Sequence, residues 1–309
     1  VTAPPGKEMG GIRFAADGTV TIVTGTLDYG QGHRAPFAQV LADRLGVPFE
    51  AIELLQGDSD QLLFGGGTGG SRSIMATGQA IDAAAKQVIE QGRQLAADRL
   101  EAAPADIIFS DGSFTVAGTD RRLALMEVAR ENPEALSAEL VAETPPSAFP
   151  NGSHVAEVEV DPETGHVALL RYTAIDDFGV MVNPLLVEGQ VHGGLVQGIG
   201  QALAENATYD ADGQLLAGSF MDYAMPRADD MPPFDLAFHP VPATTNAAPS
   251  QAIAAGRSPV RIQSKGRMTT GAVDDRVTTT AASPASSAYR SNVMPKAMPR
   301  NPLIVILST

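Results

Sequence analysis

The chain has 309 residues, of which 44% are hydrophobic, and it carries a formal net charge of −15 at pH 7. This composition predicts a globular protein with enough apolar residues for one large or two smaller domains. The negative charge argues against nucleic acid or an anionic membrane as the main partner. Because the chain contains no cysteine, disulfides, zinc–thiolate sites and cysteine-held iron–sulfur clusters within it are excluded.

The sequence contains no recognisable membrane-spanning or targeting segment. Gly, Asp or Arg interrupts every apolar stretch, and the N-terminus has neither a signal peptide nor an initiator methionine. We therefore expect no membrane insertion, a cytoplasmic location and an internal part of a longer protein. The charge is unevenly distributed, because residues 1–246 hold 13 basic and 34 acidic residues whereas residues 247–309 hold 8 and 2.

Four stretches combine short alternating apolar runs with turn-forming residues, and each is predicted to form a β-hairpin. They are centred on Asp17-Gly18 and on Asp111-Gly112, or cover residues 154–172 and 205–220.

Three stretches with helical spacing lie between the hairpins. The first follows Pro36 and ends at Gly46, the second runs from Ile74 towards Leu100, and the third covers residues 185–205 despite its glycines. Hairpins that alternate with helices predict an α+β fold in two sub-domains with mixed or antiparallel sheets, followed by an irregular C-terminal tail.

Proline-rich stretches suggest where the chain divides. The stretch near residues 140–150 separates a first sub-domain, 1–146, from a second, 147–246. Residues 224–249 are also rich in proline and are predicted to be extended and irregular. From Ala247 onward the periodicity is lost and Ser, Thr, Ala and Pro dominate, so residues 247–309 are predicted to be a disordered tail.

Three polar, glycine-rich stretches are candidates for ligand binding: residues 25–34, 65–73 and 188–203. The first two precede predicted helices and the third merges into one. A helix N-terminus has unpaired N–H groups and the positive end of a dipole, so anions bind there. A plain turn explains any one stretch, but three together favour a ligand. Neither the P-loop nor the Rossmann nucleotide signature is present.

Four longer blocks carry a resemblance to a known family. They are "TGTLDYGQGHRAPFAQVLADRLGVP", "GDSDQLLFGGGTGGSRSIMATGQAI", "DDFGVMVNPLLVEGQVHGGLVQGIGQAL" and "GSFMDYAMPRADDMP". In this order they resemble the C-terminal, cofactor-binding part of the molybdopterin-binding large subunit of the xanthine dehydrogenase/aldehyde oxidase/carbon monoxide dehydrogenase family. The resemblance extends over residues 1–246.

The resemblance implies a set of cofactor-binding residues. They are Gly30, Gln31, Gly32 and His33 in a turn that approaches the molybdenum cofactor, Gly70, Ser71, Arg72 and Ser73 in the loop that holds the pterin nucleotide's phosphates, Gln190 near the molybdenum ligands, and Gln197 and Gly198 in the same motif. In this family the pterin dithiolene holds the molybdenum, so no protein metal ligand is expected.

Other polar residues are expected to have structural roles. His154, His166, His192 and His239 have no metal-ligand spacing, and Asp28, Asp176, Asp177 and Asp222 fall at turns or strand ends where capping is the ordinary role.

The sequence departs from the family where the catalytic glutamate should stand. The family's general base lies in an N-P-L-G-x-K-G-x-G-E motif, but Pro, Leu and Gly do not follow Asn246 here. Counted from Lys265-Gly266, the glutamate's place falls on Thr269, and no glutamate occurs after Glu205. We therefore assign no catalytic residue and expect the lone chain to be inactive. A reading-frame shift near residue 247 explains the break, the charge reversal and the lost periodicity; a divergent tail is the alternative.

The resemblance implies a fragment of a molybdenum hydroxylase that binds molybdopterin cytosine dinucleotide. The intact complex would oxidise an aldehyde, an N-heterocycle or CO. FAD and [2Fe-2S] clusters are expected on partner chains, namely an FAD-binding medium subunit and an iron–sulfur small subunit, in a dimer of heterotrimers that also contains the N-terminal part of the large subunit. The alternatives are a non-catalytic molybdopterin- or nucleotide-binding module and an inert truncated product.

Overall fold

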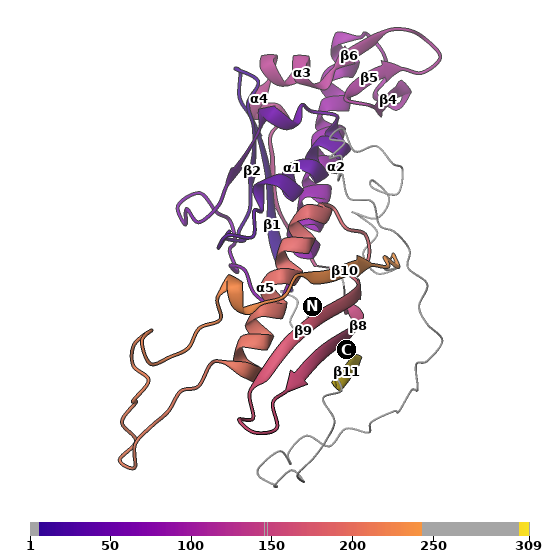
Figure 1. Cartoon of the computed structure of the whole chain (residues 1–309). Helices are drawn as coiled ribbons and strands as arrows, with labels where there is room; N and C mark the ends of the chain where they lie inside the picture. The colour runs from indigo at the N-terminus through magenta and orange to yellow at the C-terminus, as the bar shows by residue number, and fades with distance from the viewer. Residues whose placement is uncertain (1–5, 145, 147, 243–302, 309) are drawn as a thin grey trace, which may run out of the picture.

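The computed structural model describes residues 6–144, 146, 148–242 and 303–308 (Figure 1). Its strands form three sheets, with the orders β3-β2-β1-β7, β10-β9-β8-β11 and β4-β5-β6. The first two sheets are mixed and the third is antiparallel. The predicted α+β fold with mixed or antiparallel sheets is therefore confirmed.

The first sheet is built on the predicted hairpin at Asp17-Gly18. Its strands are β1 (Lys7–Phe14), β2 (Val20–Val23), β3 (Ile52–Leu55) and β7 (Ala138–Glu143). Gly18 has a φ of 94°, which a glycine adopts without a Cβ penalty, and Ala15 N–H donates to Thr19 O across the turn at 2.9 Å. β3 adds in parallel to β2, and β7 pairs antiparallel with β1.

Two helices pack beside this sheet, as their apolar spacing predicts. α1 (Arg34–Leu45) ends at Gly46, whose left-handed φ of 64° makes it the C-cap. α2 (Ser73–Arg99) ends before Leu100 and packs on β1 and β7 as well as on α1. The packing on β1 is close, because a Cβ added to Gly10 would lie 2.2 Å from the Ala80 carbonyl oxygen.

A small sheet and several short helices complete this body. They are β4 (Ile107–Ser110), β5 (Ser113–Val116), β6 (Arg122–Ala124), α3 (Leu125–Glu131), α4 (Pro133–Leu136) and the 3₁₀ turns η1 (Phe49–Ala51) and η2 (Pro104–Asp106). The hairpin predicted at Asp111-Gly112 joins β4 and β5, with positive φ at both turn residues. This is the backbone that a two-residue hairpin requires.

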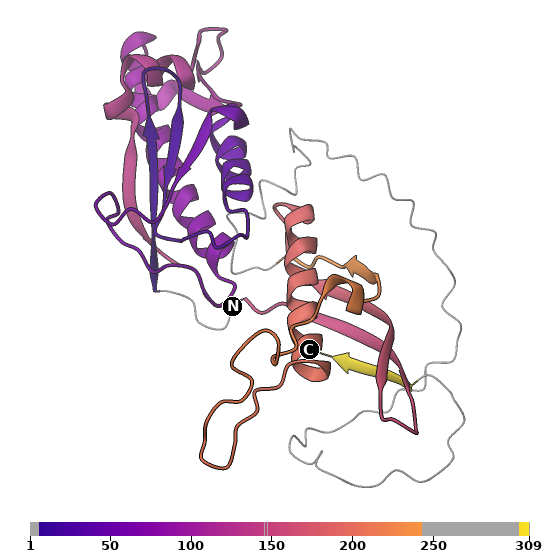
Figure 2. The ribbon, with the colours of Figure 1, turned by 60° about the vertical axis from the view of Figure 1, so that its left-hand side comes forward.

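The second body is a sheet covered by one helix. Its elements are β8 (Asn151–Val160), β9 (Val167–Asp177), α5 (Pro184–Leu203), η3 (Ala228–Asp230), β10 (Phe234–Phe238) and β11 (Leu303–Ser308). The predicted hairpin in residues 154–172 is the β8–β9 pair, and α5 is the third predicted helix. In both views α5 lies on the side of this sheet that faces the first body (Figures 1 and 2).

Three stretches of the sequence, residues 205–220, 224–249 and the tail, differ in part from what their patterns predict. The hairpin expected in residues 205–220 is reduced to one β-bridge, Tyr209–Leu215, since a hairpin without a covering layer is marginally stable. The stretch 224–249, expected to be irregular, contains β10, which pairs in parallel with β9. The tail, expected to be irregular throughout, contains β11, which pairs antiparallel with β8. The rest of the predicted tail lies outside the described residues.

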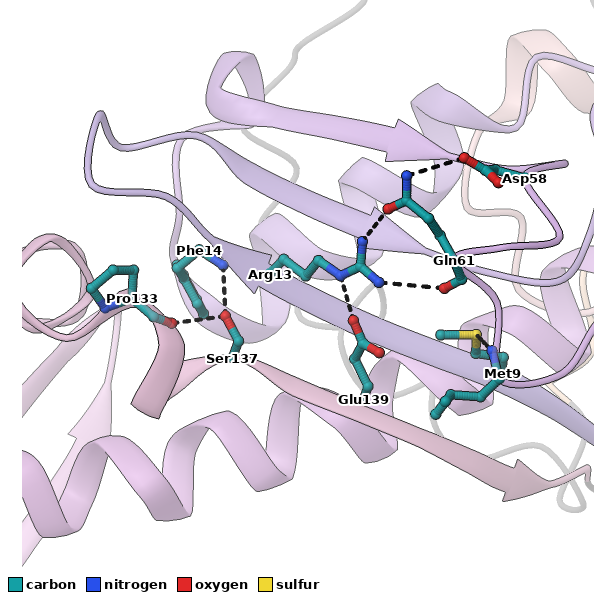
Figure 3. Close-up of polar contacts among 9 residues, drawn as sticks. Met9, Arg13, Phe14, Asp58, Gln61, Pro133, Ser137 and Glu139 are labelled. Atoms are coloured by element: carbon teal, nitrogen blue, oxygen red, sulfur yellow. Dashed lines mark hydrogen bonds and ion pairs between the residues drawn. The ribbon is translucent and has the colours of Figure 1, made fainter.

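A polar cluster fixes the loop that leads into the second glycine-rich stretch (Figure 3). The Arg13 guanidinium on β1 pairs with Glu139 on β7 and donates to the Gln61 side chain at 2.6 Å. Gln61 in turn donates to Asp58 at 3.0 Å, and the Leu63 N–H lies 3.2 Å from Met9 Sδ. The loop between β3 and α2 is therefore tied to the central strand of the sheet just before the glycines begin.

Candidate functional site

The first glycine-rich loop is organised by Asp28. Its Oδ1 accepts hydrogen bonds from the N–H groups of Gly30 at 2.7 Å and Gly32 at 3.2 Å, and its Oδ2 accepts from His33 N–H at 2.7 Å. Burial acts to raise the pKa of Asp28, but these three donors outweigh it and hold the pKa below its ordinary value. Gly30 and Gly32 have φ of 111° and 74°, so the turn needs glycine at both positions.

His33 lies under this loop rather than on its surface. Its side chain is buried, its ring lies 4.9 Å from that of Phe37, and its Nδ1 is 3.3 Å from Gln56 Nε2. Gln56 also donates to Thr26 Oγ1 at 2.8 Å. Burial lowers the pKa of His33, while the Asp28 carboxylate and the Gln56 hydrogen bond act in the opposite direction. His33 is therefore held as a neutral imidazole in an ordered polar pocket.

The second glycine-rich loop lies directly beside the first. Gly67 N–H donates to Gly25 O at 3.1 Å, and Leu27 N–H donates to Thr68 Oγ1 at 3.2 Å. The Thr68 hydroxyl is also 3.1 Å from that of Ser73, the first residue of α2. The structure thus brings two predicted segments together through residues such as Leu27 and Thr68, which are 41 positions apart in sequence.

Within the second loop, the backbone turns outward while Arg72 turns inward. Gly70 and Ser71 both have left-handed φ, 60° and 55°, and both are exposed. The Arg72 guanidinium instead donates to Gly66 O at 2.7 Å. Its Nε is buried and has no hydrogen-bond partner within the described part of the chain. Arg72 therefore braces the loop in this conformation.

The N-terminus of α2 has no side-chain cap, which is also true of α1 but not of α5. The first helical hydrogen bond runs from Ala76 N–H to Arg72 O, so the N–H groups of residues 73–75 have no partner within the helix. Arg72, the N-cap, makes no side-chain capping bond. Asp28 Oδ2 accepts from His33 N–H just before α1 and does not cap its first turn, whereas Asn183 Oδ1 caps α5 by accepting from Leu186 N–H at 3.1 Å.

The first turn of α5 completes the surface. Asn183 Nδ2 donates to Gln39 Oε1 on α1 at 2.8 Å, and a Cβ added to Gly32 would lie 3.2 Å from Leu186 Cδ2. Further along, Val191 and Leu195 are buried against the second sheet. The predicted residues Gln190, Gln197 and Gly198 are exposed on the helix.

The predicted site residues therefore divide into two groups. Those at positions 30–33 and 70–73 lie in neighbouring loops, and the α5 N-terminus touches the first loop. The side chains of Gln190 and Gln197 form no hydrogen bond within the described residues, and Gln31 folds back to accept from Tyr29 N–H. Gln190 and Gln197 are therefore exposed further along α5, and only its first turn contacts the first loop and α1.

The remaining histidines and aspartates have the following places. His154 and His166 lie on β8 and in the β8–β9 turn, His192 stacks on Phe234, and His239 follows β10. Asp177 and Asp222 accept local hydrogen bonds in turns, as predicted. Asp176 differs, because its carboxylate pairs with His154 Nε2 at 3.0 Å. No group of three or more His, Asp or Glu among the described residues could hold a metal ion.

Sequence reasoning missed several residues that shape these loops. Glu8 is fully buried on β1 next to Gly25, Thr68 links the two loops, and Gln56 holds His33. The only sequence signal for Glu8 is an acidic residue directly before the apolar and glycine run of residues 9–12. No local pattern marks Thr68 or Gln56, because their contacts come from distant parts of the chain.

Comparison with known proteins places these loops in a family. A family model for a molybdopterin cofactor-binding domain matches residues 2–232. The chain is 38% identical over 238 residues to the 6-hydroxypseudooxynicotine dehydrogenase complex subunit gamma of Paenarthrobacter nicotinovorans, covering 74% of this chain and 30% of that protein. It is 35% identical over 230 residues to the carbon monoxide dehydrogenase large chain of Hydrogenophaga pseudoflava, covering 72% and 29%.

Solved structures agree with the sequence matches. A crystal structure of Cu,Mo-CO dehydrogenase has a TM-score of 0.71 at 31% identity, over 77% of this chain and 31% of that one. Quinoline 2-oxidoreductase from Pseudomonas putida 86 has a TM-score of 0.68 at 33% identity, over 81% and 34%. The chain thus spans about 30% of the length of the curated relatives it matches. Among the described helices, none is long and apolar enough to cross a bilayer. The chain belongs to the molybdopterin cofactor-binding domain family, the molybdenum-binding part of oxidoreductase large subunits.

Proposed function

We propose that the two loops and the exposed face of α5 bind molybdopterin cytosine dinucleotide, with its phosphates at the N-terminus of α2. The observation that carries the proposal is the start of α2, which no side chain caps, beside loops rich in glycine, whose backbone has no Cβ atoms at those positions. Free N–H groups and a positive helix end suit a pyrophosphate, and this anion needs close backbone approach. The family assignment supports a molybdopterin as the ligand.

Each predicted residue has a proposed part in this binding. Gly70, Ser71 and Ser73 offer backbone N–H and hydroxyl donors to phosphate, and Arg72 supplies positive charge and braces their loop. The turn Gly30–His33 and the α5 residues Gln190, Gln197 and Gly198 face the pterin end. Amide side chains suit a pterin edge because they donate and accept hydrogen bonds together.

The wider proposal concerns the intact large subunit. The bound molybdenum centre would supply water-dependent oxidation of an aldehyde, an N-heterocycle or CO. This chain's residues bind and orient the cofactor, through sub-domains 1–146 and 147–246. The proposed partners are an iron–sulfur small subunit, an FAD-binding medium subunit and the N-terminal part of the large subunit, in a cytoplasmic dimer of heterotrimers. Relatives are themselves named as a complex subunit or a large chain.

A non-catalytic cofactor-binding module is a second candidate. It is favoured by the lack of glutamate after Glu205, where the family's general base would stand. Turnover of an aldehyde or N-heterocycle with partner chains present separates the two, because only the first candidate oxidises substrate.

Binding of cytidine diphosphate, which carries the cofactor's base, ribose and pyrophosphate, tests the proposed site. The variant Gly69→Val places a branched side chain in the exposed loop at a position where an added Cβ meets nothing within 4 Å. The matched control is Gly218→Val, which is equally open but lies in the second body. We expect the dissociation constant measured by calorimetry to rise at least about tenfold for Gly69→Val, a loss of about 1.4 kcal/mol, and to stay unchanged for the control.

Two results would contradict the site. One is equal affinity of Gly69→Val and Gly218→Val for cytidine diphosphate. The other is the absence of binding to the wild-type chain, together with no cytidine monophosphate released by acid hydrolysis of protein purified from a host that makes the cofactor.

A further inference from the structure

Glu8 is a buried carboxyl group directly behind the two loops. It lies on β1 with no exposed surface, and its Oε1 accepts from Met9 N–H at 2.8 Å. The same oxygen would be 2.8 Å from a Cβ added to Gly25, which would also meet the Phe64 carbonyl oxygen at 2.3 Å. Gly25 and Phe64 begin the two loop regions, so Glu8 sits where their backbones converge.

The positive charge of Arg72, in the second loop, acts on this carboxyl group. Burial raises the pKa of Glu8 above its ordinary value, while N–H donation by Met9 and Gly25 and the charge of Arg72 act to lower it. Glu8 Oε2 and Arg72 Nε are both buried, and neither has a hydrogen-bond partner among the described residues. The Arg72 guanidinium is meanwhile directed to Gly66 O rather than outward.

Core stability does not explain an acid at this position. Taking a carboxylate out of water is costly, and well-packed apolar residues of similar volume are often as stable as a buried charged pair. The carboxyl group is therefore better explained by its hydrogen bond at the start of the first loop and by the charge of Arg72 in the second, which acts on it without a direct ion pair.

We propose that Glu8 is a positioning residue for the cofactor loops. Its carboxyl group fixes the backbone at Gly25 and attracts Arg72, which braces the second loop at Gly66. The two interactions set the relative position of residues 25–33 and 64–73, and so keep the N-terminus of α2 open to a ligand. The identity of the ligand rests on the proposed function; the effect of Glu8 on the loops does not.

Hydrogen exchange and cytidine diphosphate binding test this role together. Glu8→Gln keeps the side-chain shape and removes the charge, and Glu8→Leu fills the same space with an apolar group. The control is Asp82→Asn, which removes another buried carboxylate, one that pairs with Arg44 and Lys86 between α1 and α2. We expect both Glu8 variants to speed amide exchange in residues 25–33 and 64–73 about tenfold.

The same variants should raise the dissociation constant for cytidine diphosphate about tenfold. Asp82→Asn should lower the melting temperature while leaving loop exchange and binding as in the wild type. Wild-type loop exchange in Glu8→Gln would overturn the proposal, as would equal changes in Glu8→Gln and Asp82→Asn. If the wild-type chain binds no cytidine diphosphate, the proposed function fails, but loop exchange still decides the role of Glu8.

Discussion

The two bodies of the molecule differ in how much core each builds for itself. The first, residues 7–143, packs 26 buried residues between its sheets and helices α1 and α2. Among the residues whose side chains the structure describes, the second, which carries α5, has a cluster of four: Tyr172, Ala174, Val191 and Leu195. The candidate loops belong to the first body and only a helix face comes from the second. The loops therefore stand on a large buried core, whereas in the described part of the second body α5 packs against a much smaller one.

The largest expected effect comes from opening the first core. Phe37 on α1 is fully buried and stacks against His33, so Phe37→Ala removes a large apolar group and leaves a cavity below the first loop. We expect a loss of about 3–5 kcal/mol in the free energy of unfolding, measured by urea denaturation. Exposed Phe149→Ala is the control and should change it by no more than about 0.5 kcal/mol. A loss below about 1 kcal/mol for Phe37→Ala would show that this core is not the stabilising element.

A smaller and more local effect is expected in the second body. His154 bridges the Tyr172 hydroxyl at 3.2 Å and the Asp176 carboxylate at 3.0 Å. His154→Leu leaves both partners buried without this bond, at a cost of about 1–3 kcal/mol. Hydrogen exchange should quicken in β8, β9 and α5 but not in β1 or β2. The milder variant Tyr172→Phe loses one bond and should cost about 1 kcal/mol; equal losses in both bodies would contradict their separate cores.

The elements of the first body follow from local sequence signals. Helix α1 has regular apolar spacing and a stop at Gly46, and the hairpin at Asp111-Gly112 has the residues that its turn requires. The candidate loops could be predicted too, because their glycines and polar residues precede helices. The way in which the two loops fit together could not be predicted, because Thr68 and Glu8 act through contacts that join distant segments.

The errors in the second body have the same physical origin. Residues 205–220 carry a hairpin pattern, but most of them are exposed, and one antiparallel bridge forms between Tyr209 and Leu215. Strand β10 was missed among prolines because it is stabilised by pairing with β9, and β11 was missed because it depends on the free edge of β8. A strand that is stabilised mainly by pairing with a distant segment need not show an alternating apolar pattern in its own sequence.

The stability of the first body should depend on pH through the buried residue Glu8. The raised pKa of Glu8 means that the Glu8 carboxyl group binds its proton more tightly in the folded protein than in the unfolded chain. The contribution of Glu8 to the free energy of unfolding is therefore fully present below its unfolded pKa of 4.5, and it is lost as the pH rises through the raised pKa of the folded protein. Glu8→Gln, which cannot ionise, should gain stability relative to the wild type between pH 4 and pH 7. Thermal melts at both pH values measure the difference, and a constant difference would contradict the raised pKa.

The contribution of His33 to stability should depend on pH in the opposite direction. Its lowered pKa gives stability that is present above the unfolded value of 6.5 and is lost as pH falls through the folded pKa. In His33→Asn this loss should disappear, so the variant and the wild type should converge as the pH is lowered. Melts of the two proteins in one buffer series decide this, with His166→Asn, an exposed residue of the β8–β9 turn, as the control.

The smallest stability effect is expected on the exposed apolar segment of the second body. Phe220 and Met221 are 83% and 93% exposed, so replacing both with serine removes almost no buried surface. The free energy of unfolding should change by no more than about 0.5 kcal/mol. Binding of a dye that reports apolar surface should nevertheless fall, because contiguous apolar side chains in water form such sites. Phe238→Ser, which strips a partly buried residue from the small core, should instead destabilise the second body and raise dye binding. If the serine pair destabilised the chain as much as Phe238→Ser, the segment would have to be part of the core, and the contrast between a self-contained first body and a thinly packed second one would fail.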